Sequence, residues 1–355
     1  MIRKAYLALA TLTGLACTAA TPPSTAPAPL RFLLINDVYF GDTLRDGTGG
    51  LARVATLRDS LERAGGPVAF VLAGDFLSPS LLTKWYRGEQ MRQQLNAVGL
   101  DLATFGNHEF EIDRDTLIAR IRGSTFKWTS ANCMLRPSGD SFPGVSRWDT
   151  ATVSGVKVGV FGVTLAGDYR SYVRCSNPDS AAHVSIAALK SAGAQLIYGL
   201  THQNLSRDSA LLAREPDLDF ILGGHEHDNH RVLVGGRRLL KADANSRSAQ
   251  LLTVRRGNDG RWVQGDQLIM IDRRIPFEPV AQAIVSAWTD SMAKRIGPER
   301  VIATTTFELD ARDVVNRSRE APLGNLVTDA VRLGTGADAA IMTSGTMRLE
   351  DVIQA

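Results

Sequence analysis

The chain has 355 residues, 44% of them hydrophobic and 22% charged, and 40 Lys and Arg against 37 Asp and Glu leave a formal net charge of +3. This composition is typical of a folded chain of about two domains, and it excludes a mainly disordered or collagen-like protein. No run of five like charges occurs, which argues against nucleic-acid polymers as partners. An anionic substrate would therefore have to be bound by a local site.

The N-terminus has the pattern of an export signal. Arg3 and Lys4 precede an uncharged stretch, residues 5–16, which is shorter than the about 20 residues needed to span a bilayer. We therefore expect a signal peptide over residues 1–17 and an exported protein, located in the periplasm or at the cell surface.

A lipid anchor is the expected link to a membrane. Residues 14–17, Gly-Leu-Ala-Cys, resemble the lipobox of bacterial lipoproteins, so we expect Cys17 to carry lipid. Residues 18–30 are uncharged and contain four prolines, which is typical of an extended tether.

Two further cysteines, Cys133 and Cys175, remain once Cys17 is assigned to the anchor. An even pair in an oxidising compartment can form one disulfide. The sequence leaves open whether these two residues meet.

From residue 31 onward, apolar runs end abruptly in small polar residues. These runs are residues 31–35, 68–73, 100–105, 195–200 and 218–222. Between the first two runs, Leu51, Val54, Leu57 and Leu61 have the spacing of one helix face. Alternating strands and helices predict an α/β domain over residues 31–275. The polar residues stand at the carboxyl ends of its strands, where such sheets bind ligands.

The remainder of the chain is expected to form a linker helix over residues 276–300 and a second unit over residues 301–355. That unit contains a helix start at Pro322 and an apolar run, residues 337–342, that predicts a strand. About 55 residues are marginal for an independent core.

A set of potential metal ligands follows five of the predicted strands. Its members are Asp37, Asp75, Asn107, His108, His202, His225 and His227. Each motif alone is weak, because Gly-Asp is most often a turn and Asn-His most often a loop. Together they supply two carboxylates, one amide oxygen and four imidazoles, a mixture that suits a pair of divalent transition metals.

These motifs resemble those of the metallophosphoesterases. The matching segments are Asp37-x-Tyr39, Gly74-Asp75, Gly106-Asn-His-Glu109, His202 and Gly224-His-Glu-His227. More narrowly, residues 317–329 and 343–348 look like the beginning of the C-terminal substrate domain of exported 5′-nucleotidases. The resemblance implies a four-layer α/β/β/α sandwich, followed by the start of a second α/β domain.

The resemblance also implies a dinuclear metal centre built around Asp75 as the bridging carboxylate. Asp37 and His227 would hold the first metal. The second metal would be held by Asn107, His202 and His225. Two such cations, chosen from Zn, Mn, Fe, Co and Ni, lower the pKa of a bound water and polarise phosphoryl oxygens.

The remaining roles follow the same resemblance. His108 would be no ligand but would stabilise the transferring phosphoryl group or protonate the leaving oxygen. Arg317 and Arg348 match substrate-side arginines, whose planar forks suit phosphate or carboxylate, and Asn107 would also contact the substrate. Glu111 stands where an Asp usually orients the catalytic His, and it is one methylene longer.

Tyr39 departs from the family pattern, because it occupies the position of a His. A neutral phenol is a poor zinc ligand but a phenolate suits ferric iron. Three interpretations stay open: Tyr39 binds iron, the first metal has one protein ligand fewer, or the site holds one metal only.

The function implied is hydrolysis of phosphoric esters, with a nucleotide or another small phosphate monoester as substrate. One alternative is a hydrolase of phosphodiesters, cyclic nucleotides or nucleotide sugars on the same scaffold, because the second domain chooses the substrate. Another is a non-catalytic metal-binding protein at the cell surface.

Overall fold

The computed structural model describes residues 28–297, 301, 303–347, 349 and 351–355. The expected signal peptide, most of the tether and the predicted substrate residue Arg348 lie outside these residues. The chain divides into two compact units, residues 1–292 and 293–355. Within the described part of the chain, no helix combines the length and the apolar character needed to cross a membrane.

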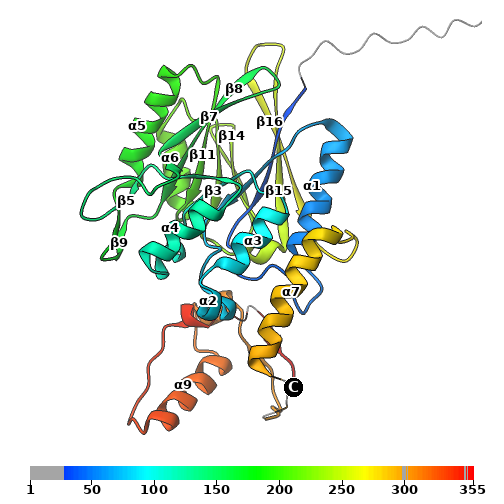
Figure 1. Cartoon of the computed structure of the whole chain (residues 1–355), viewed down its shortest axis with the longest axis vertical. Helices are drawn as coiled ribbons and strands as arrows, with labels where there is room; N and C mark the ends of the chain where they lie inside the picture. Colours follow the sequence, from blue (N-terminus) through cyan, green and yellow to red (C-terminus); the bar gives the residue numbers. More distant parts are fainter. Residues whose placement is uncertain (1–27, 298–300, 302, 348, 350) are drawn as a thin grey trace, which may run out of the picture. The chain divides into compact units, whose positions relative to one another are not determined.

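The larger unit is built on two mixed β-sheets (Figure 1). The first has the strand order β16 (Trp262–Met270), β15 (Ser248–Arg256), β1 (Leu30–Ile35), β2 (Ala69–Ala73), β3 (Leu102–Thr104), β4 (Lys127–Thr129) and β6 (Val145–Ser146). The second has the order β13 (His230–Val234), β14 (Arg237–Lys241), β12 (Phe220–Gly224), β11 (Leu196–His202), β8 (Val156–Thr164) and β7 (Trp148–Val153). The central strands of each sheet run parallel, so their carboxyl ends lie at one edge.

The two sheets pack face to face, and the residues of β1 show why. Its side chains alternate between the two faces of the sheet. Phe32 and Leu34 join the core between the sheets, whereas Leu33 packs toward the helices. The ring of Phe32 lies 5.2 Å from that of Tyr198 and 5.1 Å from that of Phe220, both in the second sheet.

Helices cover the outer face of each sheet. The elements of this unit are α1 (Leu51–Gly65), α2 (Leu81–Tyr86), α3 (Glu89–Ala97), α4 (Arg114–Gly123), α5 (Pro178–Ser191) and α6 (Leu205–Arg214), while α7 (Pro279–Ile296) reaches the boundary between the units. Apolar residues of α1, α3 and α4 share a core with the first sheet, and those of α5 and α6 share one with the second. The predicted four-layer α/β/β/α sandwich is therefore confirmed.

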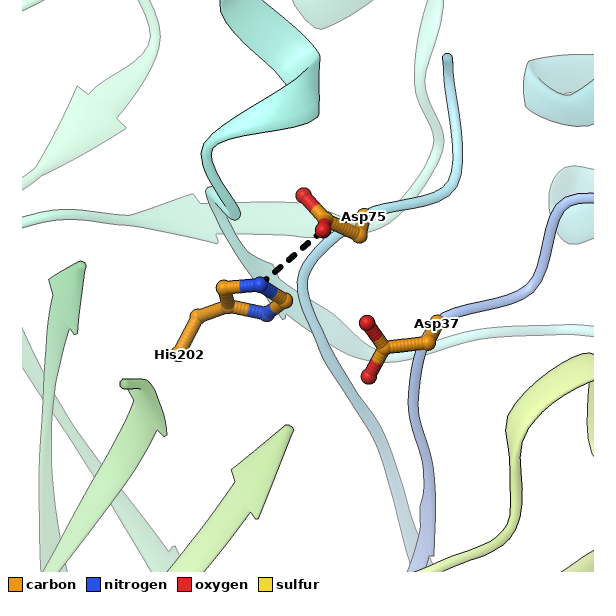
Figure 2. A group of neighbouring side chains, drawn as sticks. All are labelled: Asp37, Asp75 and His202. Carbon is orange, nitrogen blue, oxygen red and sulfur yellow. Dashed lines mark ion pairs between the residues drawn. The ribbon is translucent and has the colours of Figure 1, made fainter. Parts of the chain in front are cut away.

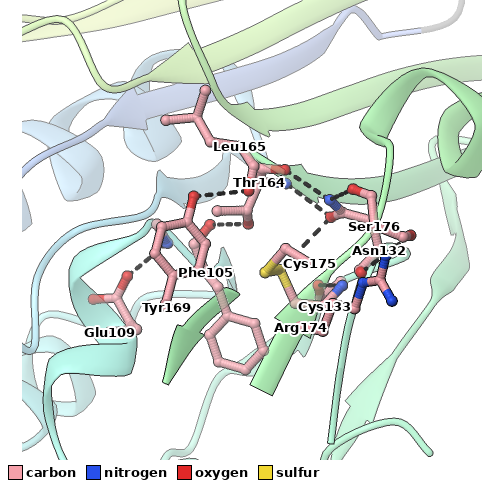
Figure 3. The surroundings of a disulfide bond; sticks show 12 residues. Phe105, Glu109, Asn132, Cys133, Thr164, Leu165, Tyr169, Arg174, Cys175 and Ser176 are labelled. Carbon is pink, nitrogen blue, oxygen red and sulfur yellow. Dashed lines mark hydrogen bonds between the residues drawn. A yellow bond between two sulfur atoms is a disulfide. The ribbon is translucent and has the colours of Figure 1, made fainter. Parts of the chain in front are cut away.

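A small antiparallel sheet carries the disulfide (Figure 3). Its strands are β5 (Cys133–Leu135), β10 (Val173–Cys175) and β9 (Gly167–Arg170). Cys133 lies opposite Cys175 in register, and the two are joined. Next to them, the Asn132 amide donates to the carbonyls of Thr164 (2.7 Å) and Ser176 (2.9 Å). The small sheet is thereby tied to the end of β8.

The second unit contains short elements around a few apolar residues. They are β17 (Leu309–Asp310), α8 (Asp313–Asn316), α9 (Pro322–Thr335) and β18 (Val352–Ile353). The helix start at Pro322 is confirmed, but the predicted strand over 337–342 is wrong, and Ile341 is 99% exposed. A strand exists only through a partner in a ladder, and the described part of this unit pairs only β17 with β18.

Candidate metal centre

The centre lies at the carboxyl ends of strands from both large sheets. Asp37 follows β1 and Asp75 follows β2, and both adopt a positive φ, 52° and 57°. Short polar side chains tolerate this left-handed conformation better than most. The backbone N–H of Asp37 donates to the carbonyl of Gly74 at 3.1 Å. These turns aim both carboxylates into the edge of the sheet.

Three buried side chains form the middle of the site (Figure 2). The ligand atoms of Asp37, Asp75 and His202 all lie within 4.8 Å of one another. His202 Nε2 lies 3.0 Å from Asp75 Oδ2, and its Nδ1 lies 2.7 Å from the carbonyl oxygen of Ala73. Because a carbonyl only accepts hydrogen bonds, Nδ1 carries a proton, and Nε2 is the atom presented to a cation.

Glycines allow the loops to approach this closely. A Cβ added to Gly106 would lie 2.0 Å from Asp75 Oδ1, and one added to Gly224 would lie 2.2 Å from the carbonyl oxygen of Ala73. Both contacts are far inside van der Waals distance. Any larger residue at Gly106 or Gly224 would therefore force these loops to move.

His108 is held beside Asp75 by two contacts. Its backbone N–H donates to Asp75 Oδ1 at 2.8 Å, and its Nε2 lies 3.9 Å from Asp75 Oδ2. On the other side of the ring, Nδ1 lies 2.6 Å from Glu111 Oε1, and the Ser78 hydroxyl donates to Glu111 Oε2 at 2.6 Å. Glu111 thus reaches the imidazole in spite of its extra methylene.

Tyr39 points into the centre of the site. Its hydroxyl lies 3.3 Å from Asp37 Oδ1, 3.4 Å from Asp75 Oδ2 and 3.1 Å from His227 Nε2. The His225 backbone N–H donates to Asp37 Oδ2 at 2.9 Å. These contacts place the phenol within reach of a cation held by the two carboxylates.

Asn107 and His225 are the other predicted ligands of the larger unit. Among the described residues, the buried amide oxygen of Asn107 accepts no hydrogen bond. An unsatisfied buried acceptor is costly, and a cation would satisfy it. The ring of His225 lies 5.3 Å from that of His202. The donor set therefore fits divalent transition metals.

The electrostatics of the site favour positive charge. Burial raises the pKa of Asp37. Burial also acts on Asp75, but the neighbouring His202 outweighs it and lowers the pKa of this carboxyl. Burial lowers the pKa of His202, but Asp75 and Asp37 outweigh this effect and raise it to about 10. His225, buried and close to His202, has its pKa lowered to about 4. The two carboxylates thus favour a positive charge on His202, and a cation bound among them would experience the same attraction.

Glu109 is a residue of the site to which sequence reasoning gave no role. Its fully buried carboxylate accepts four backbone N–H groups, those of Asp75 (2.8 Å), Phe76 (2.7 Å), Leu77 (3.0 Å) and Gly106 (2.6 Å). It thus joins the loops after β2 and β3. Its place in the Gly-Asn-His-Glu motif was visible, but no local pattern shows which N–H groups a side chain accepts.

The structure brings the predicted residues of the larger unit to one edge. These are Asp37, Tyr39, Asp75, Asn107, His108, Glu111, His202, His225 and His227. Arg317 belongs to the second unit, where it is exposed and lies near Gly345.

Comparison with known proteins identifies two segments of the chain. The family model described as calcineurin-like phosphoesterase matches residues 30–229, and the one described as 5′-nucleotidase, C-terminal domain, matches residues 301–354. Both agree with the resemblance found in the motifs.

Relatives of this chain are longer than the chain itself. The 5′-nucleotidase of Bos taurus is 26% identical over 353 residues, covering 87% of this chain and 60% of that protein. Endonuclease YhcR of Bacillus subtilis is 24% identical over 371 residues, covering 91% of this chain and 30% of that protein. The chain therefore spans less than two thirds of the length of these relatives.

A solved structure supports the architecture. The 5′-nucleotidase precursor from Thermus thermophilus superposes with a TM-score of 0.76 at 23% identity, covering 87% of this chain and 67% of that one. At this identity the similarity establishes the fold.

Proposed function

Because the chain belongs to the calcineurin-like phosphoesterase family, we propose that it is a metal-dependent phosphoric-ester hydrolase of the 5′-nucleotidase type. One observation carries the proposal. Asp75 Oδ2 is the central atom of the site, 3.0 Å from His202 Nε2, 3.4 Å from the Tyr39 hydroxyl and 3.9 Å from His108 Nε2. A carboxylate surrounded by potential ligands from several loops is suited to bridge two cations.

The residues divide into two sets of ligands around Asp75. Asp37 and His227, with Tyr39 beside them, would hold the first cation. Asn107, His202 and His225 would hold the second. Zn, Mn, Fe, Co and Ni all suit such a mixture of oxygen and imidazole donors. When bound, the cations supply positive charge for the phosphoryl oxygens and make a water more acidic.

His108 supplies the proton chemistry in this proposal. Glu111 holds the ring through Nδ1 and leaves Nε2 directed at the central carboxylate. When the bond between phosphorus and the leaving oxygen breaks, the leaving oxygen takes a proton from Nε2. Burial raises the pKa of Glu111, but its hydrogen bonds from His108 and Ser78 outweigh this effect and lower it. Glu111 is therefore a stable anion that keeps the imidazole oriented.

The substrate proposed is a nucleoside monophosphate or another small phosphate monoester. Support comes from the match to the 5′-nucleotidase C-terminal domain and from Arg317 and Arg348 in that segment, since guanidinium groups bind phosphate in a bidentate manner. The similarity to an endonuclease makes phosphodiesters the second candidate substrate class.

A substrate panel tests the proposal. The full chain would be stripped with a chelator, reloaded with Mn²⁺ or Zn²⁺, and assayed on nucleoside 5′-monophosphates, cyclic nucleotides, nucleotide sugars and a simple diester. We expect metal-restored hydrolysis with monophosphates as the best substrates. Better turnover of diesters would establish the second class. Tight binding of metal without turnover of any ester would instead support a non-catalytic metal-binding surface protein.

We further propose that the protein acts outside the cytoplasm and is tethered through Cys17. The positively charged start, the short apolar run and the proline-rich segment support this location, as does the disulfide between Cys133 and Cys175. Substitution Cys17→Ser should move the protein from the membrane fraction to the soluble fraction or leave the precursor uncleaved. An unchanged membrane fraction, or a mature chain from which Cys17 has been cut away, would exclude this anchor.

A further inference from the structure

Lys241 is a fully buried cation behind the metal centre. It ends β14, and its side chain is 0% exposed. Its Nζ donates to the carbonyls of Gln203 (2.6 Å) and Gly224 (2.8 Å) and lies 2.9 Å from Asp208 Oδ2. The carboxylate of Glu226 accepts a further hydrogen bond from it. An ammonium has three N–H groups, so these oxygens saturate it.

The partners of Lys241 flank the three proposed imidazole ligands. Gln203 directly follows His202, Gly224 directly precedes His225, and Glu226 stands between His225 and His227. The ladder between β11 and β12 ends at the pair of His202 and Gly224. Lys241 therefore binds the two loops where the hydrogen bonds between the strands stop.

The surrounding chain is arranged to admit this side chain. A Cβ added to Gly223 would lie 3.0 Å from Lys241 Cε and 3.0 Å from Asp208 Oδ2. Asp208 in turn accepts from the Gln203 amide at 2.9 Å, and Glu226 Oε1 accepts from the Leu205 N–H at 2.6 Å. The first glycine of the Gly-Gly-His motif thus makes room for Lys241.

Stability alone does not explain a charge in this position. Removing an ammonium from water is costly, and buried ion pairs can often be replaced by apolar residues without loss of stability. A buried ammonium instead fixes the position and orientation of the backbone carbonyls that it binds. Mutation of an outer residue that orients a metal ligand typically lowers metal affinity by about 10–100-fold.

We infer that Lys241 is a positioning residue of the metal centre, which holds the loops of His202 and His225 in the geometry that binds the second cation. The inference rests on the proposed metal centre. Lys241 contacts neither substrate nor cation in this assignment, and it acts through the backbone on either side of the ligands.

Arg237 provides a matched control on the same strand. It stands four residues before Lys241, and it also donates to backbone carbonyls, those of Glu215 (2.7 Å) and Leu218 (2.8 Å). These carbonyls belong to the connection between α6 and β12, away from the ligand loops. Loss of Arg237 should therefore weaken the sheet without reaching the metal centre.

The test compares Lys241→Met with Arg237→Met in the full chain. Calorimetric titration of the metal-free proteins with Mn²⁺ should show affinity about 10–100-fold lower for Lys241→Met and unchanged for Arg237→Met. Both variants should melt at a lower temperature without metal. Only Lys241→Met should also lose part of the increase in melting temperature that Mn²⁺ produces, since that increase reports binding.

Three results separate the explanations. If Lys241→Met binds Mn²⁺ as tightly as Arg237→Met, Lys241 has a structural role only and the inference is overturned. If Lys241→Met does not fold, the double variant Asp208→Asn, Lys241→Met removes the buried carboxylate as well, and it should show the same weak binding; wild-type affinity would overturn the inference. If the wild-type chain itself binds no Mn²⁺, Zn²⁺ or Fe, the proposed metal centre fails.

Discussion

The two large sheets carry different side chains at the proposed centre, and in each a buried ionisable group organises the loops, a carboxyl in the first and an amine in the second. The first sheet contributes oxygens, and the carboxylate of Glu109 gathers four backbone N–H groups behind them. The second sheet contributes imidazoles, and the ammonium of Lys241 gathers two backbone carbonyls behind them.

The difference follows from what each set of turns leaves unpaired. Asp37 and Asp75 turn through left-handed conformations, and the N–H groups that follow Asp75 need an acceptor. The loops after β11 and β12 leave carbonyls at the end of a ladder, and these need a donor. Buried polar groups without a partner are costly. The backbone thus decides whether an acceptor or a donor is needed behind each set of loops. Asp75 lies between the two halves of the centre, which are the side chains from the first sheet and the imidazoles from the second.

Loss of the bridging carboxylate should have the largest effect. Asp75→Asn keeps the size of the side chain but removes the charge that faces both halves, so we expect kcat/KM to fall by roughly 1,000-fold, equivalent to about 4 kcal/mol. Metal analysis should show that metal is lost from both of the proposed cation sites. Asp219→Asn, which removes a carboxyl directly before β12, is the control. Two tightly held metals and full turnover in Asp75→Asn would rule out the bridging role.

His108→Ala should reduce turnover without affecting either half of the centre. Because His108 is assigned a role in proton transfer and not in metal binding, kcat should fall by about 100- to 1,000-fold, with metal content near that of the wild type. Loss of metal from this variant would show that His108 belongs to the ligand set.

Glu109→Gln tests the organising charge of the first sheet. The amide group of Gln would face backbone N–H groups that now donate to a carboxylate, so the free energy of unfolding should fall by about 2 kcal/mol. Activity should fall by about tenfold or more, since the loop of Asn107 and His108 would shift. Urea unfolding and kcat/KM measure the two effects. Wild-type values for both would show that Glu109 does not organise these loops, and the parallel with Lys241 would fail.

Tyr39 tests whether the halves bind metal unequally. With a neutral phenol in the site, the first cation has fewer strong ligands than the second, and a chelator should empty that half first. Tyr39→His should raise Zn²⁺ or Mn²⁺ affinity there by at least about tenfold, since even the loss of an outer partner of a metal ligand changes affinity by about 10–100-fold.

The alternative for Tyr39 has a spectroscopic signature. A phenolate bound to ferric iron would give a visible charge-transfer band that Tyr39→Phe abolishes. A colourless protein with two equally tight metals, unchanged by Tyr39→Phe, would show that the phenol only lines the site.

The smallest effect is expected at the far end of the second sheet. Burial raises the pKa of Asp219 to about 6, although the Ile197 N–H donates to it at 2.7 Å. An acid whose pKa is higher in the folded state loses stability as pH rises, here between about 4 and about 6. Asp219→Asn should therefore increase the free energy of unfolding at pH 7 by roughly 1 kcal/mol, a value discounted for partial exposure, and by less at pH 4. Urea unfolding of the proteins in the presence of a chelator measures both values. An equal change in the free energy of unfolding at pH 7 and pH 4 would contradict the prediction.

Local patterns in the sequence determined the strands, several helices and the residues at the strand ends. The buried run of β1 and the leucines of α1 follow periods of 2 and 3.6 residues, and turn chemistry marks Gly74-Asp75 and Gly106-Asn107. The candidate ligands could therefore be predicted from the strand ends, whereas the four-layer order and the division of the ligands between two metals came from the family resemblance. The strand expected over 337–342 shows the limit, since an apolar run does not reveal whether a partner is present.

Only the tertiary structure decided which groups meet. Glu109 reaches N–H groups more than 30 residues away, Lys241 reaches a carbonyl 38 residues away, and the Tyr39 hydroxyl meets His227 across 188 residues. The pairing of Cys133 with Cys175 was decided in the same way. Hydrogen bonds and ion pairs act over about 3 Å, whereas periodicity and turn signals describe only neighbours along the chain. The ligands could thus be recognised from their order, but the buried charges that position them appear only when the strands are placed side by side.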